Sequence, residues 1–182
     1  FPLVLVLPPR QREEARALLA RASAAVAPGG IVVAAVANDE GAKSREADLK
    51  QLAGGLSVQS KHHSRVFWTA PDTRIDAVLQ AQWLKGDAPR RVSSTDVAGG
   101  FLSRPGVFAW DRVDAASRML AAALPARLPG RVADFGAGWG YLSMQVLARC
   151  AGVASLDLYE ADARALALAE GNLADAAVPV HC

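Results

Sequence analysis

The sequence predicts an α/β fold in which parallel strands alternate with helices, and three observations support this expectation. Residues 132–135 form a short apolar run that leads into three glycines on alternate positions, Gly136, Gly138 and Gly140, and a helical pattern begins at once. A second β-rich run, residues 155–159, follows that helix. Apolar runs and helical patterns also alternate near the start of the chain. This alternation is typical of a parallel sheet covered by helices.

The start of the chain predicts two strands, each followed by a helix. Residues 1–7 form a continuous apolar run of the kind that is buried on both faces of a sheet. Residues 10–26 predict a helix, and residues 31–37 predict another buried strand. Ser44 is the expected N-cap of a short helix that continues to Ala53. The inner face of the first helix is expected to consist of Ala15, Leu18, Leu19, Ala22 and Val26.

A β-hairpin is predicted next. Residues 57–61 and 65–70 are β-rich and are separated by His62-His63-Ser64, a gap of hairpin length. Parallel strands need long crossovers, so a hairpin here indicates that one antiparallel strand is added at the edge of the sheet. The two histidines are expected to be exposed turn residues, because neighbouring side chains on a hairpin point apart and chelate a metal poorly.

The periodic pattern weakens over residues 71–94, and the domain boundary is expected there. A helix is expected over residues 73–84. Asp111 is the expected cap of a later helix whose inner face consists of Val113, Ala116, Leu120 and Leu124. The predicted organisation is a first domain over residues 1–70, a linker over 71–94 and a second domain over 95–182.

The glycine-rich turn is the strongest functional signal. Gly136 and Gly138 leave the backbone without Cβ atoms where a bulky ligand could approach. Glu160 ends the next strand, 20 residues after Gly140, where an acid can accept hydrogen bonds from the hydroxyls of an adenosine ribose. A helix is expected over residues 161–176. Together these elements are half of a Rossmann-like sheet that binds a nucleoside cofactor.

Composition sets wide bounds. The chain has 182 residues, of which 52% are hydrophobic, and this suits one domain or two small ones. The net charge of +2 neither demands nor excludes a nucleic-acid partner. No apolar run approaches the roughly 20 residues of a membrane helix, and the apolar start lacks the basic region of a signal peptide. Cys150 and Cys182 have no metal or redox spacing, which indicates a reduced cytoplasm.

With these residues in view, the chain resembles the RsmC/RlmG family of ribosomal RNA guanine-N2 methyltransferases. The resemblance rests on Leu7-Pro8-Pro9-Arg10, on Gly41-Ala42-Lys43-Ser44 and on Gly106-Val107-Phe108-Ala109-Trp110-Asp111, all ahead of the glycine turn. Members of the family carry two tandem methyltransferase-like domains, the first degenerate and the second catalytic. The resemblance implies class I methyltransferase sheets in two tandem partial domains. Residues 1–70 would be the second half of the degenerate domain, and residues 95–182 the first half of the catalytic one.

The resemblance also implies the chemistry. The methyl donor would be S-adenosylmethionine (AdoMet), and the acceptor would be the exocyclic N2 of a guanine in ribosomal RNA, of the 16S small-subunit type. Glu160 would hold the ribose, Asp134 would reach the amino group of the donor, and Ala161 would border the adenine. No metal is implied. The implied cofactor-binding residues are Asp134, Gly136, Ala137, Gly138, Gly140, Glu160 and Ala161.

No catalytic residue is assigned within this chain. The family's Asn-Pro-Pro-aromatic motif follows the fourth strand of the catalytic domain, which lies beyond Cys182. The corresponding place in the first domain is Leu7-Pro8-Pro9-Arg10, where leucine replaces asparagine and cannot accept a hydrogen bond from an amine. We therefore expect an inactive first domain in a piece of a longer protein that does not turn over alone.

Several alternatives stay open. The chain could be one circularly permuted domain in which residues 1–70 supply the last sheet strands. It could be a class I methyltransferase for a protein or a small molecule, or a non-catalytic binding module. Glu160 could be an ordinary acid of the first helical turn, with Asp162 in its place at the ribose. Asp111 and Asp114 could touch the donor or only cap a helix. Four basic residues could meet phosphates or face solvent: Lys61, Arg65, Arg90 and Arg91.

Overall fold

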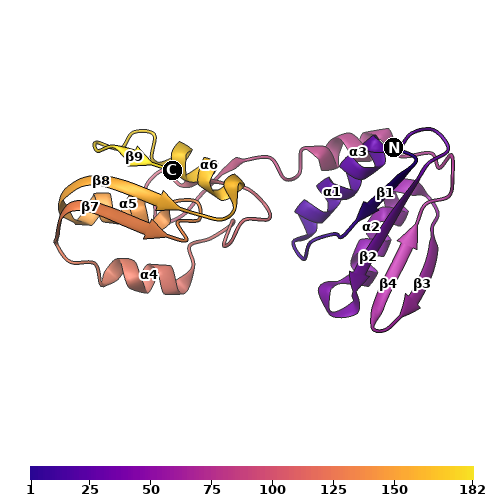
Figure 1. Ribbon diagram of the computed structural model, residues 1–182, viewed down its shortest axis with the longest axis horizontal. Helices are drawn as coiled ribbons and strands as arrows, with labels where there is room; N and C mark the ends of the chain where they lie inside the picture. The colour runs from indigo at the N-terminus through magenta and orange to yellow at the C-terminus, as the bar shows by residue number, and fades with distance from the viewer. The chain divides into compact units, whose positions relative to one another are not determined.

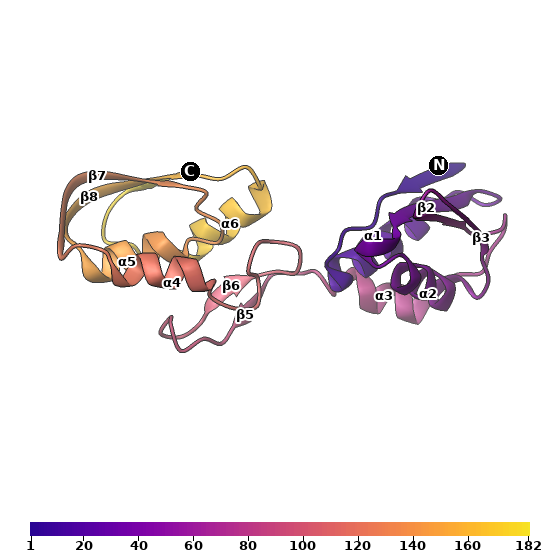
Figure 2. The same ribbon diagram turned by 90° about the horizontal axis from the view of Figure 1, so that it is seen from below.

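The computed structural model describes residues 1–182, and the chain divides into two compact units, Phe1–Ala88 and Pro89–Cys182. In each unit the helices lie on one face of a sheet (Figures 1 and 2). The strands of the two units belong to separate sheets, so residues 1–70 do not complete the sheet of the second unit. The circularly permuted single domain is therefore not the arrangement of this chain. No helix is long and apolar enough to cross a bilayer.

The first unit contains a four-stranded sheet of order β1-β2-β4-β3. β1 (Leu3–Val6) and β2 (Ile31–Ala37) are parallel, whereas β4 (Ser64–Trp68) runs antiparallel to both β2 and β3 (Ser57–Lys61). The predicted hairpin forms, but its second strand lies between β2 and β3 instead of at the edge. The two-residue turn, in which His62 and His63 both have positive φ, makes β4 antiparallel to β3, and the pairing of β4 with β2 places it between the two strands.

The core of the first unit lies between this sheet and its helices, α1 (Arg12–Ala25), α2 (Ala42–Ala53) and α3 (Ala77–Leu84). A short 3-10 helix, η1 (Asn38–Glu40), precedes α2. The prediction that residues 1–7 are buried on both faces is wrong, because helices cover one face only. Val6 is buried, whereas Leu3 and Leu5 are exposed.

Two further expectations for this unit need correction. α2 begins at Ala42 after Gly41, whose left-handed conformation forms the N-cap, so Ser44 lies inside the helix. The range 71–94 is not a continuous linker, because α3 packs on α1 and its Trp83 is buried in the core. The guanidinium of Arg16 lies 5.0 Å from the centre of the Trp83 ring, which adds a cation–π contact.

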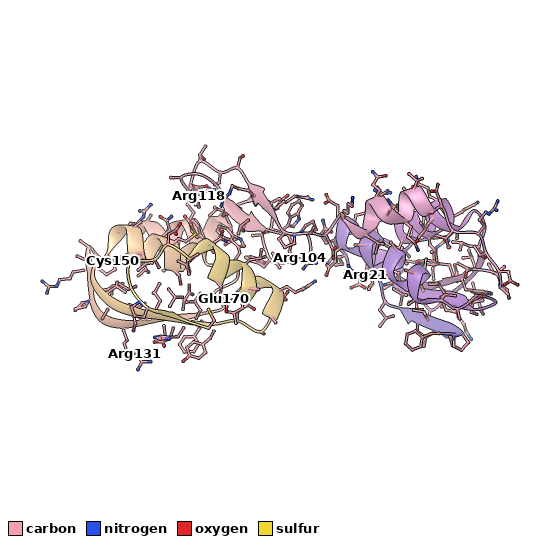
Figure 3. The ribbon with its side chains drawn as sticks, turned by 90° about the horizontal axis from the view of Figure 1, so that it is seen from above. Arg21, Arg104, Arg118, Arg131, Cys150 and Glu170 are labelled. Carbon is pink, nitrogen blue, oxygen red and sulfur yellow. The ribbon has the colours of Figure 1, made fainter.

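The second unit contains a parallel sheet of order β7-β8-β9, formed by β7 (Arg127–Phe135), β8 (Ala151–Tyr159) and β9 (Val180–His181). Its helices are α4 (Ala115–Ala122), α5 (Tyr141–Arg149) and α6 (Ala163–Asn172). The opposite face of the sheet is bare. Arg131 points away from the helices there and pairs with Asp157 of the neighbouring strand at 3.1 Å (Figure 3).

Ahead of this sheet lies a small antiparallel hairpin of β5 (Arg90–Val92) and β6 (Phe101–Ser103). The helix that follows the hairpin, α4, begins at Ala115 and is capped by Asp114, not by Asp111 as predicted. The side chain of Asp114 accepts a hydrogen bond from the Ser117 backbone N–H at 2.9 Å, which fixes the first turn. The predicted inner face of α4 is also partly wrong, because Leu120 is exposed.

Candidate functional site

The glycine-rich turn connects β7 to α5 at the carboxyl end of the sheet. The Tyr159 carbonyl accepts hydrogen bonds from the N–H groups of Gly136 (2.8 Å) and Ala137 (3.2 Å), which anchors the turn to the end of β8. Gly136 and Gly138 have φ of +78° and +55°. A Cβ atom on either would meet no heavy atom within 4 Å. The backbone therefore faces open space on this side of the turn.

Gly140 serves packing instead. A Cβ atom there would lie 3.2 Å from the Cβ of Ala169 and 3.3 Å from its Cα. Contacts this short would force α6 to shift by a few tenths of an ångström, because this helix lies directly on the backbone of the turn. The three alternating glycines thus have two functions: two leave space above the turn, and the third lets a helix approach it.

Glu160 faces the turn. Its Oε2 accepts a hydrogen bond from the Gly138 N–H at 2.8 Å, and its Oε1 accepts one from the Asp162 N–H at 2.9 Å. A carboxylate has about four lone-pair sites, so capacity remains for further donors. Asp162 is engaged elsewhere: it caps α6 and pairs with Arg164, whose hydrogen bond lowers the pKa of the Asp162 carboxyl. The acid left with accepting capacity at this edge is therefore Glu160.

Two hollows flank the turn, and Gly136 lines both. The first, of about 410 Å³, lies between the turn and the loop before α4 and is lined by Phe108, Ala109, Asp114, Ser117, Gly136, Ala137, Gly138, Trp139, Tyr141 and Leu142. The second, of about 870 Å³, lies at the ends of β7 and β8 and is lined by Phe135, Gly136, Leu158, Tyr159, Glu160, Ala161, Leu166 and Cys182. Both volumes include the open solvent at the mouths of the hollows.

Asp134 and Gly140 line neither of these hollows. The Oδ2 atom of Asp134 accepts a hydrogen bond from the Ser143 hydroxyl at 2.7 Å, so the acid is tied to the first turn of α5. The other five implied residues line one hollow or both. Ser143 was not singled out from the sequence as the partner of Asp134. Its position in the first turn of α5, directly after the strand that ends near Asp134, is a signal that could have identified it.

The loop before α4 forms the other wall of the first hollow. Asp114 lines it, and its hydrogen bond from the Ser117 backbone lowers the pKa of the carboxyl, so the group is ionised at neutral pH. Asp111 instead pairs with Arg112. Phe108 is exposed, and Ala109 has a φ of +48°, a conformation that is unusual for a residue with a side chain and is frequent at functional sites.

In the first unit, the loop that follows β1 and contains Pro8, Pro9 and Arg10 is held by the side chain of Arg45. Arg45 is buried and donates hydrogen bonds to the carbonyl oxygens of Pro9 (3.2 Å) and Arg10. The side chain of Leu7, which precedes this loop, is exposed. The carbonyl oxygens of Pro9 and Arg10 are thus taken by the protein itself.

A buried carboxylate supports this arrangement. Asp48 is 1% exposed and accepts hydrogen bonds from Arg12 and Arg16, each with an N–O distance of 2.8 Å. Burial acts to raise the pKa of Asp48, but the hydrogen bonds from the two arginines outweigh it, and the pKa is lowered. The network joins α1 to α2 and is a stabilising element of the first unit.

The candidate phosphate-binding residues are mostly engaged within the protein. Arg65 pairs with Glu46 at 2.5 Å, and the guanidinium of Arg90 lies 4.5 Å from the centre of the Trp110 ring. Arg91 donates to the Gly99 carbonyl at 3.1 Å. No group of three or more His, Cys, Asp or Glu side chains is placed to hold a metal ion.

The chain is similar to known proteins along most of its length. Residues 98–182 match the family model of the methyltransferase small domain. The chain is 30% identical to the ribosomal RNA small subunit methyltransferase C of Psychromonas ingrahamii and 31% identical to that of Vibrio vulnificus, over 95% and 94% of its length. In both cases the alignment covers 49% of the relative, so the chain spans about half the length of the relatives it matches.

A solved structure has the same fold. The Thermus thermophilus 16S rRNA N2 G1207 methyltransferase (RsmC), in complex with AdoMet and guanosine, superposes with a TM-score of 0.74 and 22% identity. The match covers all of this chain and 49% of that one. The expected α/β fold of class I methyltransferase type is therefore confirmed.

Proposed function

We propose that this chain, which belongs to the RsmC-type family of ribosomal RNA methyltransferases, holds the AdoMet site of an enzyme that methylates N2 of a guanine in 16S ribosomal RNA. The partner would be ribosomal RNA or the small ribosomal subunit, and the place of action the cytoplasm. The residues that align the guanine amine would lie outside this chain. The chain alone would bind the donor without turning it over.

One observation carries the proposal: the Glu160 carboxylate is held at the edge of a glycine turn whose backbone faces open space. Glu160 accepts from the Gly138 N–H and keeps lone pairs for other donors, as a ribose diol requires. The space above Gly136 and Gly138 is open, because a Cβ atom added to either residue would meet no heavy atom within 4 Å. A site of this kind suits a nucleoside with a tail that crosses the turn.

The two hollows divide the donor between them. We place the adenosine in the hollow lined by Glu160 and Ala161, and the methionine part in the hollow lined by Asp114 and the turn. The ionised Asp114 would attract the positively charged amino group. When bound, AdoMet supplies an electrophilic methyl group on a sulfonium. The residues of this chain bind and orient it, which is the main requirement of an in-line transfer.

Asp134 has a supporting role in this proposal. Because its Oδ2 atom accepts from Ser143, the acid fixes the end of β7 against α5 below the turn. The unused Oδ1 atom could still accept a hydrogen bond through a water molecule. Gly140 acts through packing on α6. These two residues would thus shape the AdoMet site without lining it.

Isothermal titration of the chain with AdoMet tests the proposal. Glu160→Gln removes one charged acceptor, and hydrogen bonds to charged groups are worth about 1.5–3 kcal/mol, so AdoMet should bind roughly 10- to 100-fold more weakly. Asp162→Asn is the matched control: it makes the same charge change two residues away, and asparagine caps a helix as well as aspartate does. Equal affinities for wild type and Glu160→Gln would contradict the assignment.

Methyl transfer needs the complete reading frame. We expect it to transfer the methyl group of AdoMet to small ribosomal subunits or 16S RNA and to yield N2-methylguanosine on nucleoside analysis. Transfer to a protein or a small molecule instead would favour the alternative class I methyltransferase. Absence of AdoMet binding at millimolar concentration would favour a non-catalytic module that keeps the fold as a scaffold.

We further propose that the first unit is a non-catalytic scaffold. Arg45 occupies the carbonyl oxygens of Pro9 and Arg10, which a target amine would otherwise approach. Leu7 has no acceptor atom in its side chain. Both features would disable amine methylation at this place.

A further inference from the structure

The hairpin of β5 and β6 packs against the back of the glycine turn. The ring of Phe101 in β6 stacks on that of Trp139 in the turn, with the ring centres 3.7 Å apart and the planes at 5°. Both side chains are buried. The hairpin is also fastened to α4, because Arg118 of that helix forms two hydrogen bonds of 2.9 Å with Asp96 in the hairpin loop. It is thus an integral part of the second unit.

One amide side chain joins the hairpin to the turn. The Oδ1 atom of Asn172, at the end of α6, accepts a hydrogen bond from the Leu102 N–H at 2.6 Å. Its Nδ2 group donates to the Leu102 carbonyl at 2.9 Å and to the Trp139 carbonyl at 2.8 Å. The amide therefore pairs with β6 as a neighbouring strand would, and uses its second N–H bond on the turn.

We propose that Asn172 is a positioning residue of the AdoMet site, which it controls by fixing the peptide between Trp139 and Gly140. This inference rests on the proposed function, because it assumes that AdoMet lies over the turn. The glycines place few limits on the backbone on either side of Trp139, so hydrogen bonds must hold the peptides of the turn. Tyr159 holds the first peptides, Glu160 holds the Gly138 N–H and Asn172 holds the Trp139 carbonyl.

The position of this peptide matters for the ligand. It is the second peptide after the one whose N–H group binds Glu160, and glycines with positive φ flank Trp139 on both sides. Without Asn172 this peptide would be held on one side only, by the hydrogen bond from the Gly140 N–H to the Ala137 carbonyl at 2.9 Å, and its glycine neighbours accept many conformations. Rotation there would move the Gly138 N–H and with it the Glu160 carboxylate. The hairpin, which anchors Asn172, is thereby coupled to the ribose contact.

Two substitutions test this role. Asn172→Leu removes all three hydrogen bonds at similar volume, whereas Asn172→Asp keeps the acceptor for the Leu102 N–H and loses both donors. The control is Gln145→Leu, which removes a buried amide that donates to the Asp96 carbonyl of the same hairpin at 3.4 Å but does not touch the turn. All variants are measured in the 182-residue chain, with AdoMet affinity by titration calorimetry and stability by the thermal midpoint.

We expect both Asn172 variants to bind AdoMet about tenfold or more weakly than wild type, and Gln145→Leu to bind with less than about a threefold change. Wild-type affinity in Asn172→Asp would overturn the proposal, since that variant cannot donate to the Trp139 carbonyl. The proposal would also be overturned if Gln145→Leu lost as much AdoMet affinity per degree of lost thermal midpoint as the Asn172 variants do. The weaker binding would then reflect general instability of the second unit.

Amide hydrogen exchange gives a readout without AdoMet. In the Asn172 variants the Gly140 N–H, which belongs to the same peptide as the Trp139 carbonyl, should exchange about tenfold faster than in wild type, while amides of β8 keep their rates. Unchanged exchange at Gly140 would refute the positioning role. If Gly140 exchanged faster in the Asn172 variants but neither they nor the wild type bound AdoMet, Asn172 would still position the turn. The proposed cofactor would then be rejected.

Discussion

Alanine substitutions at two glycines of the same turn should separate ligand binding from stability. In Gly138→Ala the new methyl group meets no protein atom within 4 Å, and the φ of +55° lies in the left-handed region. The cost to folding is then the backbone term alone, about 1 kcal/mol. For a unit of this size that lowers the thermal midpoint by about 4–8 °C.

The same methyl group would occupy the space that we assign to AdoMet. Overpacking by one methyl group typically costs about 1–3 kcal/mol, so the dissociation constant should rise roughly 5- to 150-fold. In Gly140→Ala the methyl group would lie 3.2 Å from the Ala169 Cβ, at a φ of +93°. Strain and overpacking then add to roughly 2–5 kcal/mol, and the loss of stability should exceed that of Gly138→Ala.

Differential scanning calorimetry and AdoMet titration of the two variants check this contrast. The reasoning predicts that Gly138→Ala keeps most of its stability and loses AdoMet affinity, whereas Gly140→Ala loses stability first. Wild-type affinity in Gly138→Ala would show that AdoMet does not lie over that glycine. A Gly140→Ala variant as stable as Gly138→Ala would refute the close packing of α6 on the turn.

Three other predictions concern single side chains. The pKa of Asp48 is lowered in the folded state, so this residue contributes fully to the free energy of unfolding above the unfolded pKa of about 3.9. That contribution is lost as pH falls through the lower folded pKa. Asp48→Asn should lower the free energy of unfolding by about 3 kcal/mol at pH 7 and flatten its acid dependence in urea titrations. Leu7→Asn should not create methyl transfer in the first unit, since Arg45 still holds the loop carbonyls; detectable methylated guanine from that unit would contradict this. Ser143→Ala should destabilise the second unit by about 1–2 kcal/mol in thermal unfolding, because Asp134 loses its hydroxyl partner.

The sequence predicted best those features that depend on local chemistry. The strand, glycine turn and helix around Gly136 were identified because positive φ at alternate positions requires glycine. The strand Ile31–Ala37 was placed with its observed bounds, since a β-branched apolar run between turn residues has few other solutions. The fold class followed from these elements.

Features that depend on distant partners escaped prediction. The cap of α4 is a local exception: Asp111 and Asp114 can both cap a helix, and the hydrogen bond from Ser117, three residues later, selects Asp114. The insertion of β4 between β2 and β3 depends on which edge is free, which no local pattern records. Asn172 gave no signal because its partners lie 70 and 33 residues away. Its amide looked like any polar group at a helix end.

The reversed strand β4 has a consequence for the order of assembly of the first unit. β3 and β4 are joined by two residues, and such hairpins close within about 1–10 μs. The strand that bonds directly to β2, however, is the later member of the pair. β3 reaches the sheet only through β4, and we expect the fast-closing hairpin to form first and then to dock on the β1–β2 pair. Slippage by one residue in that early hairpin would turn Phe67 out of the core and leave the sheet two strands short.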